Sequence, residues 1–89
     1  MYSKNKKAMT VDERAHVDKV KQLPCSVCDR HGPSEAHEID QGEWFTSIAL
    51  CASCHRCEHN GLHGRKVMWN VMRLTEIGAL GITIMRLMK

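Results

Sequence analysis

The chain has 89 residues, a formal net charge of +3 at pH 7 and 43% hydrophobic residues. This length allows one small domain, whose hydrophobic core is marginal unless a metal ion or another cross-link supplements it. The mildly positive charge is compatible with a nucleic-acid partner but does not establish one. The N-terminal sequence lacks the apolar core of a secretory signal, and no apolar run is long enough to cross a membrane, so we expect a cytoplasmic protein.

The N-terminal segment, residues 1–9, is polar and basic. We expect it to form a disordered tail, either solvated or in contact with phosphate, before a single domain over residues 10–89. The first helix is predicted from Thr10, because Thr10 and Glu13 have the spacing of a capping box. Pro24 cannot continue that helix, which should therefore end near Gln22.

Four cysteines form two Cys-x2-Cys pairs, Cys25 with Cys28 and Cys51 with Cys54. Each pair at this spacing can place two thiolates on one tetrahedral ion, and four-cysteine sets are common structural zinc sites. The odd total of five cysteines, clustered in such pairs, favours metal binding over disulfides. The main alternative uses Cys57 in place of Cys51, since Cys54-x2-Cys57 is also an acceptable pair. Otherwise Cys57 is a free thiol.

Two short strands are predicted between these cysteine pairs, over residues 35–40 and 44–50. The second strand is enriched in β-branched and aromatic residues, and Gln41-Gly42 supplies the turn. A hairpin of this kind brings the second cysteine pair back beside the first.

The residues after Cys54 have helical spacing, so we expect His55 and His59 on one face of a helix. Further helical sequence follows, and Thr75 has the character of an N-cap for a separate final helix. Trp44 and Trp69 are the expected aromatic anchors of the core. Four methionines of the C-terminal region either fill the core or form a self-association surface: Met68, Met72, Met85 and Met88.

A second set of ligands is formed by three histidines. His37 lies on the first predicted strand, while His55 and His59 follow the second cysteine pair. Three neutral imidazoles leave coordination positions open, as a hydrolytic metal centre requires. His63, four residues after His59, is an alternative ligand if Asn60-Gly61 does not break the helix. Glu35 shares a strand face with His37 and is expected to orient its ring.

These motifs resemble the HNH, or ββα-metal, nuclease superfamily in its zinc-stapled phage and prophage form. The resemblance covers residues 23–64 and consists of the first cysteine pair, the AH-x-I strand, the hairpin and LC-x2-CH-x3-H. It implies an α+β fold, with a small zinc-stabilised ββα-metal finger flanked by an N-terminal helix and C-terminal helices. It also implies a metal-dependent DNA endonuclease or nickase in the cytoplasm of a bacterial host.

The resemblance also implies roles for single residues. His37, His55 and His59 take the metal-ligand positions, and Glu38 takes the position of the general base. The chain departs from the family pattern at two places, because the base is usually histidine and Thr46 stands where the motif has asparagine. These departures favour an alternative, a catalytically inactive zinc-binding ββα module that binds DNA or a host protein.

The cofactors follow from the two ligand sets. The cysteines imply a structural Zn²⁺, and the histidines imply a second divalent cation, which would be Mg²⁺, Mn²⁺, Ni²⁺ or Zn²⁺. Three basic residues near the second set are candidates for contacts with the DNA backbone, with solvated charge as the alternative: Arg56, Arg65 and Lys66. A homodimer through the C-terminal helix is a further expectation.

Overall fold

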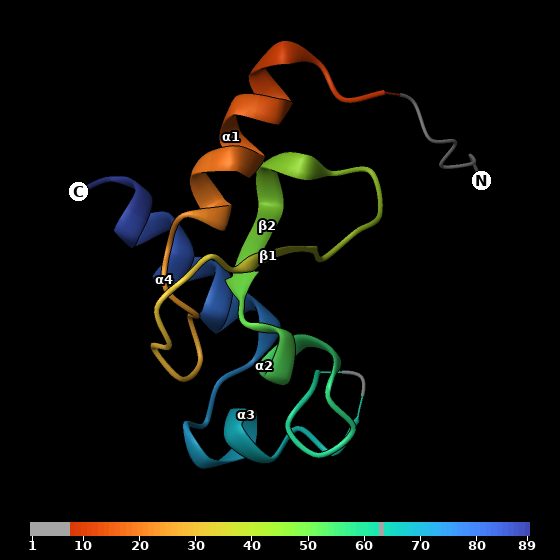
Figure 1. The fold of residues 1–89 in the computed structure, drawn as a ribbon, viewed down its shortest axis with the longest axis vertical. Helices are drawn as coiled ribbons and strands as arrows, with labels where there is room; N and C mark the ends of the chain where they lie inside the picture. Colours follow the sequence, from red (N-terminus) through yellow and green to blue (C-terminus); the bar gives the residue numbers. More distant parts are fainter. Residues whose placement is uncertain (1–7, 63) are drawn as a thin grey trace.

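The computed structural model describes residues 8–62 and 64–89 and shows a small α+β fold, as predicted (Figure 1). A central antiparallel hairpin has α1 at one end, α2 and α3 at the other, and α4 alongside. None of the helices in these residues is long and apolar enough to span a membrane. The elements in chain order are α1 (Val11–Lys21), β1 (Glu35–Glu38), the short 3-10 helix η1 (Trp44–Thr46), β2 (Ser47–Leu50), α2 (Ala52–Arg56), α3 (Val67–Val71) and α4 (Glu76–Leu87).

The capping box at the start of α1 is confirmed. The Thr10 hydroxyl accepts a hydrogen bond from the Glu13 N–H at 3.1 Å, and the Glu13 carboxylate accepts one from the Thr10 N–H at 2.8 Å. Val17 and Val20 are the buried residues of this helix and face the hairpin side of the molecule. The helix ends at Lys21, one residue earlier than predicted.

The hairpin is shorter than predicted. His37 pairs with Ile48 and Glu38 pairs with Ser47, after which the strands separate. A tight turn precedes η1, with the Glu43 N–H bonded to the Asp40 carbonyl at 2.9 Å. Residues 44–46 then form η1 instead of the start of β2, because the Thr46 N–H bonds back to the Glu43 carbonyl at 3.2 Å. Gly42 adopts a φ of +89° in the turn over residues 40–43, a conformation that favours glycine.

The free edge of β2 is covered by other parts of the chain. The Ala49 carbonyl accepts a hydrogen bond from the Ser26 N–H at 2.9 Å, and the Ala49 N–H donates to the Thr83 hydroxyl at 3.2 Å. The buried Thr83 hydroxyl also bonds the Ser26 hydroxyl at 2.8 Å and donates to the Ala79 carbonyl at 3.0 Å. A hydroxyl has one donor and two acceptor sites, so Thr83 is fully satisfied and joins α4, β2 and the first cysteine pair.

We expect Thr83→Val to destabilise the zinc-loaded protein by about 2 kcal/mol or more, since it leaves the Ala49 N–H and the Ser26 hydroxyl buried without this partner. Valine has nearly the same volume, so little packing is lost. Denaturant unfolding at constant free zinc measures the effect. The control is Thr46→Val, which removes an exposed hydroxyl bonded to the Glu43 carbonyl and should cost much less. Equal losses in the two variants would contradict the role assigned to Thr83.

The hydrophobic core is continuous with the cysteines. Trp69 on α3 is completely buried and donates its indole N–H to the Cys54 carbonyl at 2.9 Å, as expected of a core anchor, whereas Trp44 is only partly buried. Among the methionines, Met68 packs against the core, whereas three are exposed: Met72, Met85 and Met88. The core cluster is formed by Val27, Ile48, Leu50, Leu62, Trp69 and Ala79 together with the buried cysteines.

The final helix, α4, begins where the sequence predicts. Thr75 is its N-cap, and the Thr75 hydroxyl accepts a hydrogen bond from the Gly78 N–H at 3.1 Å. The inner face of α4 buries Ala79 and Thr83 against β2 and the core. This helix therefore forms one wall of the region in which the cysteines and histidines lie.

Candidate metal centre

The four predicted cysteines form one cluster, and their Sγ atoms all lie within 4.8 Å of one another. The Sγ atoms of Cys28 and Cys51 are 3.7 Å apart. Four thiolates about 2.3 Å from a tetrahedral zinc ion have sulfurs about 3.8 Å apart, so this donor set fits a structural zinc. Cys57 is exposed and outside the cluster, so the alternative pairing with Cys57 in place of Cys51 is wrong.

Backbone N–H groups point at two of the sulfurs. The Val27 N–H donates to the Cys25 Sγ and the Cys54 N–H donates to the Cys51 Sγ, both at 3.4 Å. Cys51 is also the N-cap of α2, where a side-chain acceptor satisfies an N–H that the helix leaves unpaired. A helix N-terminus favours a thiolate, so the fold prepares this position for a metal ion.

The pKa values of the thiols differ within the cluster. Burial disfavours the Cys25 thiolate, but N–H groups of Cys28, Cys51 and Val27 outweigh it and lower the pKa of Cys25. Burial and the neighbouring Cys25 charge raise the pKa of Cys54, and burial with the same charge raises that of Cys28. Full ionisation of four such close thiols therefore depends on a compensating cation.

Arg86 on α4 hydrogen-bonds to the backbone beside the first cysteine pair. Its Nη1 donates to the carbonyls of Pro24 and Cys25, both at 3.3 Å, and its Nη2 pairs with the Asp29 carboxylate. Asp29 itself has a φ of +64°, which turns the chain after Cys28. Nothing in the sequence marks this role of Arg86, because a basic residue in the last turn of a helix is ordinary and its partners lie 57 to 62 positions earlier.

Two of the three predicted histidines meet beside the cysteine cluster. His37 on β1 and His55 on α2 stand edge to face, with ring centroids 4.9 Å apart and planes at 63°. The His37 Nε2 bonds the Glu76 carboxylate at 2.8 Å, and the His55 Nδ1 bonds the Glu35 carboxylate at 2.7 Å. His37 is buried and His55 partly buried. We call these two rings the histidine pair.

The carboxylate partners differ from the prediction. Glu35 orients His55 and not His37, because its side chain lies on the α2 side of β1. Glu35 also binds Arg56 through two hydrogen bonds, of 3.1 and 2.5 Å. Burial opposes ionisation of Glu35, but His55 and Arg56 outweigh it and lower its pKa. Glu76, which bonds His37, was missed because it comes from α4, 39 positions along the chain.

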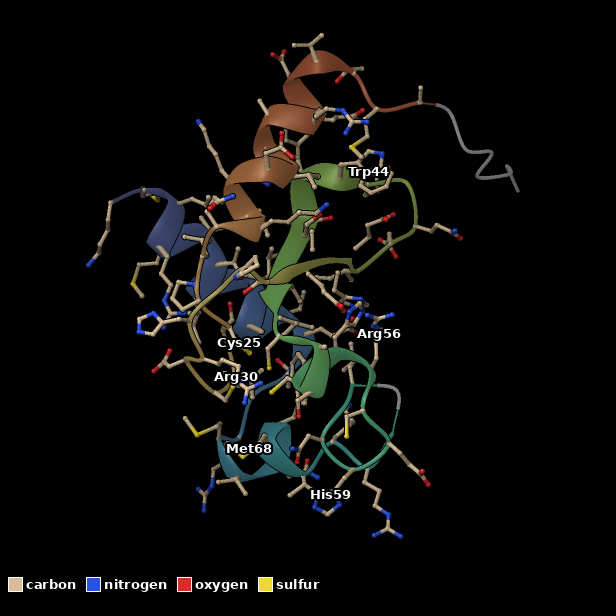
Figure 2. All side chains as sticks on the ribbon, viewed as in Figure 1. Cys25, Arg30, Trp44, Arg56, His59 and Met68 are labelled. Atoms are coloured by element: carbon tan, nitrogen blue, oxygen red, sulfur yellow. The ribbon has the colours of Figure 1, made fainter. Side chains whose placement is uncertain are left out.

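The expected helix carrying both His55 and His59 is wrong. Helix α2 ends at Arg56, and Cys57 is extended, with φ −67° and ψ 141°. The chain then reverses, with the Gly61 N–H bonded to the Cys57 carbonyl at 2.6 Å. This reversal requires glycine, because a Cβ at Gly61 would overlap the Cys57 carbonyl. His59 is exposed and lies low in the molecule, in the region of α3 and below Arg56 (Figure 2).

The cation-binding role of the histidines stays a prediction. Within residues 8–62 and 64–89, the four cysteines are the only group of three or more histidine, cysteine or acidic side chains with ligand atoms close enough for one ion. His63, the alternative ligand, lies outside the described residues.

Glu38 and Thr46 hydrogen-bond to the hairpin turn. The Glu38 carboxylate accepts the Gly42 N–H at 2.7 Å, and the Thr46 hydroxyl donates to the Glu43 carbonyl at 3.1 Å. Since adjacent strand residues face opposite sides of a sheet, Glu38 points away from the face that carries His37.

The three basic residues predicted to contact DNA differ in setting. Arg56 follows His55 directly, and its side chain is 68% exposed although Glu35 holds it. Arg65 and Lys66 lie in the turn between α2 and α3 and are also exposed. All three are therefore available to solvent, and only Arg56 is joined to the histidine pair by a described contact.

No protein-family model, curated protein or solved structure shows significant similarity to this chain. The four-cysteine cluster, the hairpin and the helices are consistent with a zinc-stapled ββα module. These features assign the chain to no family.

Proposed function

We propose that this protein is a zinc-stapled ββα module of HNH type, which cleaves or nicks DNA with the help of a divalent cation. The proposal is supported above all by the contact between His37 and His55 at 4.9 Å. One ring comes from the first strand and the other from the helix after the second strand. His55 also follows the zinc-cluster residue Cys54 directly, so the cluster fixes the start of α2 and with it the site.

In this proposal the histidine pair holds the cation, which would be Mg²⁺, Mn²⁺, Ni²⁺ or a second Zn²⁺. Metal-binding histidines commonly bond a carboxylate through their other nitrogen, which fixes the ring and raises its basicity. Glu76 and Glu35 are suited to that role. We keep His59 as the proposed third ligand, which requires the segment after α2 to bring it toward the pair.

The bound cation would polarise a phosphate oxygen and stabilise charge on the leaving oxygen. Arg56 is proposed to position the DNA backbone, because it is exposed next to the site, and Arg65 and Lys66 would extend that contact. For Glu38 to act as the general base, its carboxylate must leave the Gly42 N–H. Action in the cytoplasm of a bacterial host belongs to the same proposal.

The test is cleavage of supercoiled plasmid by the pure zinc-loaded chain with each of these cations. We expect nicked or linear product from the natural chain and a loss of at least about 100-fold from His55→Ala, because removal of a ligand costs more than removal of a supporting carboxylate. His31→Ala is the matched control, since His31 is exposed on the loop before β1. Retention of one zinc per chain and of the circular-dichroism spectrum shows that the fold is intact. Unchanged cleavage in His55→Ala would remove the site assignment.

A second candidate is a ββα module without catalysis that binds DNA or a host protein. The hydrogen bonds of Glu38 and Thr46 to the hairpin turn favour it, because both family positions that serve catalysis are occupied by residues with a turn-forming role. It predicts one metal ion per chain and no cleavage with any of the cations. Elemental analysis of the natural chain and of the His37→Ala, His55→Ala double variant separates the two, since only the nuclease proposal expects a second ion that the variant loses.

A further inference from the structure

Two consecutive residues of α2 donate hydrogen bonds to the Glu35 carboxylate. Its Oε1 accepts from the His55 Nδ1 at 2.7 Å and from the Arg56 Nε at 3.1 Å, and its Oε2 accepts from the Arg56 Nη2 at 2.5 Å. The imidazole and the guanidinium therefore share one oxygen. Because the positive charge of Arg56 offsets the negative charge of the carboxylate, it weakens the attraction of Glu35 for the His55 N–H.

The ion pair between Arg56 and Glu35 is easily exchanged. The Arg56 side chain is 68% exposed and that of Glu35 is 31% exposed, and water screens pairs in such a setting. A guanidinium binds phosphate as well as carboxylate, with two parallel hydrogen bonds. Duplex DNA carries one negative charge about every 1.7 Å along its axis, so it competes with a single carboxylate. The His55 side chain is only 17% exposed, so phosphate reaches Arg56 first.

We propose that Glu35 is a positioning residue for His55, and that a phosphate group of DNA controls it by drawing Arg56 away. With Arg56 on the carboxylate, two donors share the charge of Glu35. With Arg56 on phosphate, that charge acts on the His55 N–H alone. A stronger bond there fixes the ring and raises the basicity of its other nitrogen. This inference rests on the proposed function and deepens it, because DNA binding would prepare His55 for the cation.

His37 supplies an internal comparison. Its Nε2 bonds the Glu76 carboxylate at 2.8 Å, and no lysine or arginine in the described part of the chain forms an ion pair with Glu76. Phosphate therefore has no cation to remove from this carboxylate. The proposal predicts that DNA changes the hydrogen bond of His55 and leaves that of His37 nearly as it is.

The test is NMR of the imidazole N–H protons in the zinc-loaded full chain, with labelled histidine and no second cation added. A short DNA duplex is added at fixed pH and ionic strength, and fluorescence anisotropy establishes saturation. We expect the His55 Nδ1 proton to move downfield and to exchange more slowly with water, because its bond to Glu35 strengthens. The His37 Nε2 proton should move far less.

Three variants separate this coupling from a general effect of charge. Arg56→Gln should give the downfield His55 proton without DNA, and DNA should then add little. Glu35→Gln should abolish the response, because the charged acceptor is gone. Arg14→Gln makes the same change of charge at an exposed position of α1 and should behave as the natural chain.

Inorganic phosphate, added at the same ionic strength, distinguishes DNA from a small phosphate ligand. We expect the duplex to act at a concentration at least about 100-fold lower, because it presents many phosphates together. An equal response to both would overturn the assignment to DNA. An unchanged His55 proton in Arg56→Gln, or in the saturated DNA complex, would overturn the coupling. The nuclease proposal is judged separately: a shifted His55 proton without plasmid cleavage refutes only the nuclease, and cleavage with an unchanged proton refutes only the coupling.

Discussion

Cys54→Ser is expected to abolish folding of this domain at ordinary temperatures, whereas Cys57→Ser, three residues later, should leave it folded. The Cys54 Sγ is one of the four clustered donors, while Cys57 is exposed and outside the cluster. Structural zinc sites contribute about 10–16 kcal/mol of apparent binding energy, as much as the whole stability of a typical domain. Serine is a poor zinc ligand, so loss of one thiolate should remove most of that contribution.

The measurement combines circular dichroism with the zinc content of the purified variants. We expect the natural chain and Cys57→Ser to hold one zinc and unfold cooperatively on heating. The natural chain should also unfold at room temperature when a strong chelator removes the metal. A metal-free chain that keeps its cooperative transition would show that the hydrophobic core is sufficient for folding. The zinc site would then add only a small part of the stability.

The features that could be predicted from the sequence are local ones. Thr10 with Glu13, Thr75 before the final helix and the Cys-x2-Cys spacing each depend on residues within four positions of one another. Backbone geometry then determines that the helix caps form, because a side chain at the right offset reaches the unpaired N–H of its own helix end. The α+β fold class was implied by the resemblance that the cysteine pairs, the hairpin and the following helix carry together.

The features that were missed depend on contacts across the chain. Glu76 meets His37 and Arg86 meets the first cysteine pair only because α4 packs beside the hairpin. Nothing near Glu76 or Arg86 in the sequence indicates these partners. The early end of α2 has a different cause, since the reversal at Gly61 competes with helical propensity and prevails. His59 was misplaced for that reason.

Trp69→Ala is expected to destabilise the zinc-loaded protein by about 3–5 kcal/mol, the usual cost of deleting a large buried aromatic side chain. Trp69 is 0% exposed and belongs to the core cluster that contains the cysteines. Trp69→Phe should cost less, because the Cys54 carbonyl keeps its hydrogen bond from the Leu62 N–H at 2.9 Å when the indole N–H is lost. Trp44→Ala is the control, because Trp44 is only partly buried and lies at the other end of the hairpin.

The effect of Trp69→Ala should also be visible in zinc binding. If the metal-free chain is unfolded, zinc affinity and folding are one equilibrium, and each 1.4 kcal/mol of lost stability lowers the apparent affinity about tenfold. Competition with a chromophoric chelator should therefore give a loss of at least about 100-fold for Trp69→Ala and a much smaller loss for Trp44→Ala. Unchanged affinity in Trp69→Ala, together with a lower unfolding temperature, would mean that the cysteine cluster forms without the core. The cluster would then be a separate unit, and α3 would pack on it without helping to build it.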